Sequence, residues 1–345
     1  MPQTPTPANQ ANGVPAPLLE IDNLKTYFNT LDGVVRAVDG VSFKMEAGQT
    51  LGLVGESGCG KSVTAASILR LLPKRSSQII DGKIVFQRSN DQFVDMVPLN
   101  PDGHLIRTIR GNEIAMIFQE PLTSLSPVHT VGVQIAETVA LHQQVSKSEA
   151  RLRTIEMLEQ VGIPSAAQRF DEYPHQFSGG MRQRAMIAMA LSCNPRLLIA
   201  DEPTTALDVT IQAQILELMK GLQDELGMAI LIITHDLGVI AEMADQIAVM
   251  YMGKIVERAD VRTIFNQPLH PYTVGLMRSI PHLGSRSKGR ERLTPIPGSV
   301  PDPFSIPPGC AFYPRCPAPK KPACQQETPL QEIEPGHFVR CTLYE

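Results

Sequence analysis

The sequence predicts an α/β fold in which helices cover a mainly parallel core sheet, and three observations lead to this prediction. Apolar strands alternate with helical segments, as is typical of parallel sheets; these strands are expected at 50–54, 114–118, 197–200 and 228–233. A glycine-rich loop follows the first strand and leads into a helix expected at 63–72, before Pro73. Apolar residues recur at spacings of three and four between about 121 and 193. This spacing predicts a helical subdomain inserted between strands.

The other segments follow in chain order. Residues 1–17 are rich in Pro, Ala, Gln and Asn without an apolar period, so we expect a disordered leader. Residues 19–21 and 41–43 alternate as strands with one buried face do. Three helices are expected from the spacing of their apolar residues, at 131–141, 147–161 and 181–192. A further helix is expected at 211–226, between the strands at 197–200 and 228–233. Beyond about residue 266 the composition changes, and 295–308 contains six prolines ahead of a group of cysteines.

Composition and charge argue against several classes of protein. The chain has 345 residues and a net charge of -4, whereas nucleic-acid binders usually carry a basic excess. Its first residues lack the basic start and apolar run of a signal peptide, so we expect a reducing compartment. The apolar run at 228–233 is far shorter than the roughly 20 residues that span a bilayer. Any membrane role must therefore come through a partner.

Residues 55–62 match the phosphate-binding loop G-x-x-x-x-G-K-[ST] at every defined position. The glycines allow successive backbone N–H groups to surround phosphate oxygens, and the following helix directs its positive end at the same charge. A glycine-rich turn without a nucleotide is the alternative, but the strand before and the helix after favour a phosphate site. Lys61 should reach the β- and γ-phosphates, and Ser62 should ligate Mg²⁺. The expected nucleotide-binding residues are Gly55, Glu56, Ser57, Gly58, Cys59, Gly60, Lys61 and Ser62.

Two carboxylates follow the apolar strand at 197–200. Ligands of open α/β sheets bind at the carboxyl ends of the strands, so Asp201 and Glu202 should face the phosphate-binding loop. Asp201 is suited to contact Mg²⁺, and Glu202 to polarise a water molecule that attacks the γ-phosphate. An apolar strand that ends in Asp-Glu can also be a solvated strand end, but after a phosphate-binding loop we expect the catalytic role.

With these residues in place, the sequence resembles the ATP-binding cassette (ABC) proteins through further motifs in the family's order. Ser178-Gly179-Gly180 looks like the family's signature motif, and its serine should cap a helix. Ala206-Leu207-Asp208 resembles the D-loop. The resemblance implies that Ser178, Gly179, Gly180 and Asp208 contact nucleotide.

The resemblance also implies roles for single side chains. Gln119 resembles the family's Q-loop glutamine, which serves catalysis and Mg²⁺ binding, and His235 resembles its switch histidine, which orients the γ-phosphate. The family places an aromatic ring on adenine near the start of the domain. Either Tyr27 or Phe28 could serve, and we favour Phe28.

The resemblance covers about residues 18–265 and implies an ABC-type P-loop nucleotide-binding domain with antiparallel N-terminal strands and the helical subdomain at about 121–193. Residues 266–345 then form a C-terminal extension. In this family two such domains stack head to tail, so that the signature motif of one faces the phosphate-binding loop of the other. A second ABC ATPase subunit, which we expect to be a distinct paralogue, is therefore implied.

Four segments resemble, more narrowly, the first ATPase subunit of dipeptide and oligopeptide importers: 177–184, 201–212, 270–273 and 295–298. This resemblance implies two transmembrane permease subunits, an extracytoplasmic peptide-binding protein and a peripheral position on the cytoplasmic face of the membrane. Nickel or another small cargo stays open, because close relatives carry such cargoes. The rival classes are soluble ABC ATPases of DNA repair or translation, whose paired cassettes and insertions are absent here, and a metal-sensing regulator built around the tail.

Four of the six cysteines gather near the end of the chain: Cys310, Cys316, Cys324 and Cys341. Clustered thiols in a reducing compartment suggest a metal site, but the paired C-x-x-C spacing usual for zinc is absent. Zn²⁺, a [4Fe–4S] cluster and unligated thiols stay open from the spacing alone. The resemblance to peptide-importer subunits favours the [4Fe–4S] cluster. Because Lys61 and Glu202 lie in another domain, this site should be structural or regulatory.

Overall fold

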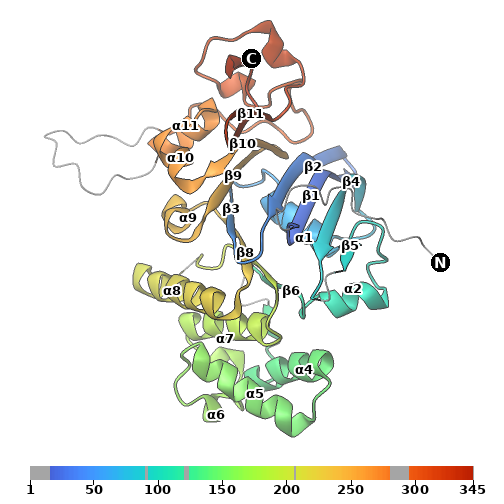
Figure 1. Ribbon diagram of the computed structural model, residues 1–345, viewed down its shortest axis with the longest axis vertical. Coiled ribbons are helices and arrows are strands. Elements are labelled where there is room, and N and C mark those ends of the chain that lie inside the picture. The colour runs from blue at the N-terminus through green and yellow to red at the C-terminus, as the bar shows by residue number, and fades with distance from the viewer. Residues whose placement is uncertain (1–15, 90–91, 120–123, 206, 280–294, 345) are drawn as a thin grey trace, which may run out of the picture.

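The computed structural model describes residues 16–89, 92–119, 124–205, 207–279 and 295–344. Its centre is a sheet in the strand order β11-β12-β10-β9-β3-β8-β7-β6 (Figure 1). The parallel strands of this sheet are β3 (Thr50–Val54), β6 (Ile114–Ile117), β7 (Leu197–Asp201), β8 (Ala229–Thr234) and β9 (Gln246–Tyr251). The antiparallel strands are β10 (Lys254–Asp260), β11 (Gln331–Glu334) and β12 (His337–Val339).

The register of the parallel strands places their carboxyl ends at one edge. Val54 of β3 pairs with Thr234 of β8, and Asp201 of β7 pairs with Ile233. Every residue of β3, β7 and β8 is buried, because helices or the second sheet cover both faces of these continuous apolar runs. The phosphate-binding loop, the Asp-Glu pair and His235 therefore start from neighbouring strand ends.

A smaller antiparallel sheet packs beside α1 (Lys61–Ile68) in the order β2-β1-β4-β5. Its strands are β1 (Leu19–Thr30), β2 (Gly33–Met45), β4 (Ser77–Gln87) and β5 (Phe93–Asp95), and α2 (His104–Ile109) follows them. Helix α1 ends four residues before the predicted position. The guanidinium of Arg110 donates to the carbonyl oxygens of Leu69 (2.6 Å) and Arg70 (2.7 Å), and Arg70 has a φ of 54°. This distant side chain ends the helix.

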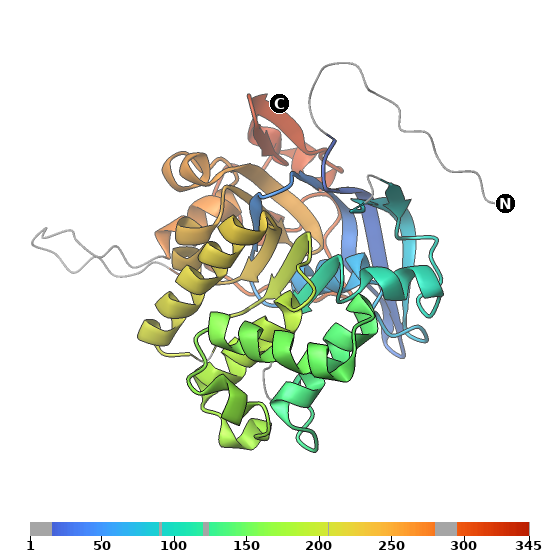
Figure 2. The same cartoon turned by 60° about the horizontal axis from the view of Figure 1, so that its bottom comes forward.

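The helical subdomain lies at the far end of the molecule from the C-terminal segment, as Figures 1 and 2 show. It contains α4 (Val131–Gln143), α5 (Lys147–Gln160), α6 (Ala166–Arg169), the short η1 (Pro174–Gln176) and α7 (Gly179–Leu191). The predicted helices at 131–141, 147–161 and 181–192 agree with α4, α5 and α7 to within two residues at each end. The inserted helical segment is thus correctly predicted.

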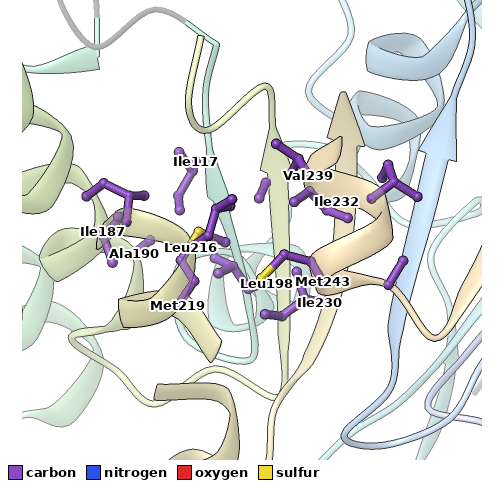
Figure 3. Close-up of a cluster of buried hydrophobic side chains, with 14 of the residues drawn as sticks. Ile117, Ile187, Ala190, Leu198, Leu216, Met219, Ile230, Ile232, Val239 and Met243 are labelled. Carbon is purple, nitrogen blue, oxygen red and sulfur yellow. The ribbon is translucent and has the colours of Figure 1, made fainter. Parts of the chain in front are cut away.

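The main core lies between the parallel strands and the helices α7, α8 (Val209–Leu226) and α9 (Leu237–Met243). Figure 3 shows side chains from these elements in contact, among them Leu198 and Ile230 from the sheet and Ile187, Leu216 and Met243 from the helices. All five are less than 7% exposed. This core therefore contains residues of both α7, which begins at the signature motif, and β7, which ends at Asp201.

The C-terminal segment extends the main sheet and packs on it. Helices α10 (Val261–Asn266) and α11 (Pro271–Arg278) lead into short turns η2 (Tyr313–Arg315), η3 (Pro322–Gln325) and η4 (Thr342–Tyr344). Strand β12 pairs with β10 through Glu257 and Val339. No helix in the described ranges is long and apolar enough to cross a membrane. Of the predicted leader, residues 1–17, only 16 and 17 lie within the described residues.

Candidate active site

The phosphate-binding loop joins β3 to α1, and its glycines are required by its geometry. Gly55, Gly58 and Gly60 have φ values of 154°, 80° and 103°, which L side chains rarely adopt. A Cβ atom on Gly60 would lie 2.1 Å from the carbonyl oxygen of Ala37, and one on Gly55 would lie 2.2 Å from that of Met250. The loop therefore tolerates no side chain at either position.

Lys61 and Ser62 begin α1 and face the strand ends. Lys61 is buried, and its Nζ donates to the carbonyl oxygens of Gly55 (2.7 Å) and Glu56 (3.1 Å). The hydroxyl of Ser62 donates to Oδ1 of Asp201 at 3.2 Å. Burial raises the pKa of Asp201, and the hydrogen bond from Ser62 opposes this shift. A hydroxyl and a carboxylate, both suitable ligands for Mg²⁺, thus meet beside the loop.

Glu202 lies where three hydrogen-bonding side chains converge. Its carboxylate accepts from Thr205 Oγ1 (2.9 Å) and Gln119 Nε2 (3.2 Å), and it lies 3.2 Å from Nδ1 of His235. Burial acts to raise the pKa of Glu202, but the hydrogen bonds from Thr205 and His235 outweigh it and hold the pKa below its usual value. The carboxylate is therefore ionised at neutral pH. The structure brings together Gln119, Glu202 and His235 from three different strand ends.

The backbone at Glu202 adopts a left-handed conformation, with a φ of 50°. Its N–H donates to the carbonyl oxygen of Ile233 at 2.8 Å, which holds this conformation in place. Strained backbone of this kind is common at functional sites. Thr205 is a site residue that the sequence analysis missed; its only sequence signal is its place three residues after Glu202.

Ser178 and Asp208 act as helix caps in this structure. Oγ of Ser178 accepts from the N–H of Met181 at 3.3 Å at the start of α7, and Asp208 accepts from the N–H groups of Thr210 and Ile211 at the start of α8. Both caps are exposed. A Cβ atom on Gly179 would meet no atom within 4 Å. Within the described ranges, no hydrogen bond or ion pair joins Ser178 or Asp208 to the phosphate-binding loop of the same chain.

The two candidate adenine-stacking residues differ in their surroundings. The hydroxyl of Tyr27 donates to Oδ1 of Asp39 at 2.7 Å, and burial together with this carboxylate raises the pKa of Tyr27 to about 12. Phe28 is half-buried in β1, between Val35 of β2 and Ser77 of β4. Tyr27 is thus engaged by a carboxylate, whereas no such partner restrains Phe28.

The four C-terminal cysteines Cys310, Cys316, Cys324 and Cys341 line one small cavity of about 30 Å³. Burial raises the pKa of Cys310, of Cys316 and of Cys341, the last to about 11, and neighbouring thiols raise each of them further. Across the described residues, no group of three or more His, Cys, Asp or Glu side chains is placed to hold a metal ion. The structure thus gathers the four thiols around one cavity, but the described residues do not confirm the metal site expected there.

The strand–loop–helix phosphate site, with an Asp-Glu pair at the end of β7 on the far side of β8, defines a P-loop nucleoside triphosphatase. Residues 38–205 match the family described as "ABC transporter", and residues 256–324 match "Oligopeptide/dipeptide transporter, C-terminal region". The chain belongs to the ABC transporter family and is an ABC-type ATPase. The resemblance predicted from the motifs is therefore confirmed.

Individual relatives match along nearly their whole length. The chain is 53% identical to "Probable peptide ABC transporter ATP-binding protein y4tR" of Sinorhizobium fredii, over 94% of each chain. It is 51% identical to "Oligopeptide transport ATP-binding protein AppD" of Bacillus subtilis, over 95% of this chain and 97% of the relative. "Dipeptide transport ATP-binding protein DppD" of the same organism is also 51% identical, over 94% of each chain.

Solved structures support the fold. A dimeric structure of the ATP-binding cassette MJ0796 in a post-hydrolysis state with ADP and Pi is 26% identical, with a TM-score of 0.61. It aligns over 71% of this chain and 99% of its own. A second dimeric structure of the same cassette has a TM-score of 0.62 at the same identity and coverage. The ABC ATPase fold expected from the sequence is confirmed.

Proposed function

We propose that this chain is the ATP-hydrolysing subunit of a membrane importer for dipeptides or oligopeptides. The main support for a peptide cargo is the match of residues 256–324 to the oligopeptide/dipeptide transporter C-terminal region. Relatives with peptide-transport names match at about half identity along nearly the whole chain. In this proposal, residues 18–265 bind nucleotide, about 121–193 form the helical subdomain, and 266–345 form the extension.

The hydrolytic step follows from the residues around Glu202. Lys61 and the backbone N–H groups of the loop bind the phosphates of ATP. Ser62 and Asp201, which already share a hydrogen bond, would hold Mg²⁺ together with Gln119. When bound there, Mg²⁺ would neutralise charge on the phosphate oxygens. Glu202 is ionised and accepts a proton from the attacking water, while His235 orients the γ-phosphate.

A second ATPase subunit completes the site. Ser178 and Asp208 are exposed helix caps, and within the described part of the chain their side chains bond to the first turns of α7 and α8. The start of α7 therefore offers its N–H groups and positive end to a phosphate on another subunit. Two ATP molecules would close the pair, and hydrolysis would reopen it. In this pairing, the signature motif of each subunit would face the phosphate-binding loop of the other.

The two ATPase subunits would work with further proteins, which together form an importer. We propose two transmembrane permease subunits, an extracytoplasmic peptide-binding protein and a peripheral place on the cytoplasmic face of the membrane. The segment 119–135, of which 120–123 lie outside the described residues, would transmit the closing motion from Gln119 to the permease subunits. Phe28 would stack on adenine.

We propose that the cysteine cavity holds a [4Fe–4S] cluster, which the resemblance to peptide-importer subunits favours over a zinc ion. The four thiols line one cavity, and four thiolates are the usual ligands of such a cluster. His270, 1% exposed, lines the same cavity. Its Nδ1 accepts from the N–H of Tyr272 (3.0 Å), which leaves the proton on Nε2, and Nε2 has no partner among the residues that the structure describes.

A buried N–H without an acceptor is costly, so the occupant of this cavity should accept a hydrogen bond. The sulfur atoms of a [4Fe–4S] cluster do so. We expect protein purified without oxygen to be brown, to absorb broadly near 400 nm and to contain about four irons per chain. Zinc without iron would replace the cluster with a zinc site, and neither metal would refute ligation.

Transport is tested with the assembled importer in proteoliposomes. We expect ATP-dependent uptake of a labelled dipeptide or oligopeptide, and no uptake when Glu202 is replaced by Gln. Labelled nickel serves as the competing cargo in the same vesicles. Uptake of nickel without any peptide uptake would refute the peptide assignment but leave the ATPase role intact.

A further inference from the structure

The phosphate-binding loop is held by a side chain from the C-terminal extension. The guanidinium of Arg315 donates from Nη1 to Oε2 of Glu56 (2.7 Å) and from Nη2 to Oε1 of Glu56 (3.0 Å). This paired arrangement is the strongest form of an arginine–carboxylate contact. The Arg315 side chain is only 5% exposed, so water screens the pair weakly. A residue of the extension thus fixes the second position of the loop.

A second contact reaches the backbone of the same residue. The hydroxyl of Tyr272, which is fully buried, accepts from the N–H of Glu56 at 2.9 Å. Tyr272 packs against Tyr251 and Phe312, with ring centroids 4.5 and 5.4 Å away. Tyr251 also accepts from Nη1 of Arg315 at 3.2 Å. Both contacts therefore come from one packed aromatic cluster.

Glu56 has no polar group left free to move. Its carboxylate is bound by Arg315, its N–H by Tyr272, and its carbonyl oxygen by Nζ of Lys61 (3.1 Å). Lys61 is the residue that binds the phosphates of ATP. The shape of the loop, and the position of its lysine, therefore depend on two side chains from beyond residue 266.

Arg315 and Tyr272 are each next in the chain to residues that line the cysteine cavity, namely Cys316 and Pro271. Arg315 directly precedes Cys316, whose N–H donates to the carbonyl oxygen of Tyr313 at 3.4 Å. The N–H of Tyr272 donates to His270, which lines the cavity. A change in the spacing of the four thiols must therefore move the backbone that carries Arg315.

We propose that Arg315 and Tyr272 are positioning residues for the phosphate-binding loop, and that through them ligation of the four cysteines sets the affinity for ATP. The first half of this proposal, the positioning of the loop by Arg315 and Tyr272, rests only on the contacts to Glu56. The second half, the regulation of ATP affinity by the cysteines, rests on the metal site proposed above. Loss of the cluster would loosen Arg315 and weaken ATP binding from a distance.

The test measures equilibrium binding of a fluorescent ATP analogue with Mg²⁺ to the full chain, purified without oxygen. We expect Arg315→Met to weaken binding by about tenfold or more, the scale of losing charge-assisted hydrogen bonds. Tyr272→Phe removes one hydroxyl and should weaken binding about three- to tenfold. The matched control is Glu334→Gln, because Glu334 is an exposed glutamate of the extension on β11, which three strands of the sheet separate from β3 and its loop. It should bind within about twofold of wild type.

Thermal unfolding of each variant distinguishes an effect on the phosphate-binding loop from a general loss of stability where the extension packs on the rest of the chain. If the extension only stabilises the fold, Arg315→Met lowers the unfolding temperature without a change in affinity, and the proposal is wrong. If Arg315→Met does not fold, Tyr272→Phe decides the same question. Tight binding by folded Tyr272→Phe then overturns it.

A last measurement separates the two halves. Wild-type protein is compared before and after its iron is removed with a chelator. Weaker ATP binding after removal supports regulation through the cysteines. Unchanged binding, or wild-type protein that never contained metal, overturns the regulatory half, whereas the effect of Arg315→Met still decides the first half by itself.

Discussion

Replacing Glu202 with Gln removes the proposed general base while keeping its shape. The side chain is 12% exposed and lies among donors from Thr205, Gln119 and His235. The amide oxygen of Gln can still accept from Thr205, so the fold and the phosphate-binding loop should persist. We therefore expect ATP binding within about threefold of wild type, with hydrolysis as the quantity that changes.

The size of the loss follows from the pKa of Glu202. Because the hydrogen bonds from Thr205 and His235 hold this pKa below its usual value, the base is fully ionised at neutral pH but weak. General bases contribute about 10²- to 10⁴-fold, and most when their pKa lies near the working pH. Glu202 should thus contribute near the low end, about 10²- to 10³-fold. The barrier then rises by at least about 2.7 kcal/mol.

The assay is phosphate release by the assembled transporter at saturating ATP. Glu217→Gln is the control, because Glu217 is an exposed glutamate on α8 away from the site, and it should hydrolyse ATP at the wild-type rate. Turnover of Glu202→Gln within a few-fold of wild type would remove Glu202 from the role of base. A loss of ATP binding would show instead that Glu202 shapes the nucleotide site.

Three further outcomes are expected. The purified chain should hydrolyse ATP poorly until a second ATPase subunit and permease are added, because Ser178 must reach ATP on another subunit; a fully active monomer by light scattering contradicts this. Gly60→Ala should lower the free energy of unfolding by at least about 1–3 kcal/mol and weaken ATP binding, because its Cβ meets the Ala37 carbonyl oxygen. Gly221→Ala, in open space on α8, should instead be neutral or stabilising by calorimetry. His270→Leu should make the reduction potential of the proposed cluster more negative in anaerobic titration, since a hydrogen bond to cluster sulfur favours the reduced state; an unchanged potential contradicts this contact.

The sequence predicted the parts of the fold that local patterns specify. The strands at 50–54, 197–200 and 228–233 are continuous apolar runs because both of their faces are buried, and such runs can be read directly. No element was predicted between 74 and 113, where the structure has β4, β5 and α2. These strands belong to a sheet at the side of the molecule, where half-exposed positions weaken the apolar pattern.

In the site, too, residues in local sequence motifs could be predicted, whereas contacts between distant segments could not. Residues of the phosphate-binding loop and the Asp201-Glu202 pair could be read because each motif is contiguous in the chain. Gln119 and His235 needed the order of motifs, and the structure brings both to Glu202. Contacts between distant segments, such as Arg315 to Glu56 across 259 positions, leave no local pattern. Such contacts arise only when the chain has folded.

Arg315 also explains how a carboxylate can stand inside a loop that binds phosphates. Glu56 places a negative charge beside the binding site of a more highly charged anion, and Arg315 compensates this charge through its paired hydrogen bonds. Without Arg315, Glu56 should therefore repel ATP in addition to losing its position. We expect the double variant Glu56→Gln/Arg315→Met to bind ATP more tightly than Arg315→Met alone, although less tightly than wild type. If the double variant binds as weakly as Arg315→Met, the charge of Glu56 is immaterial and positioning alone accounts for the effect.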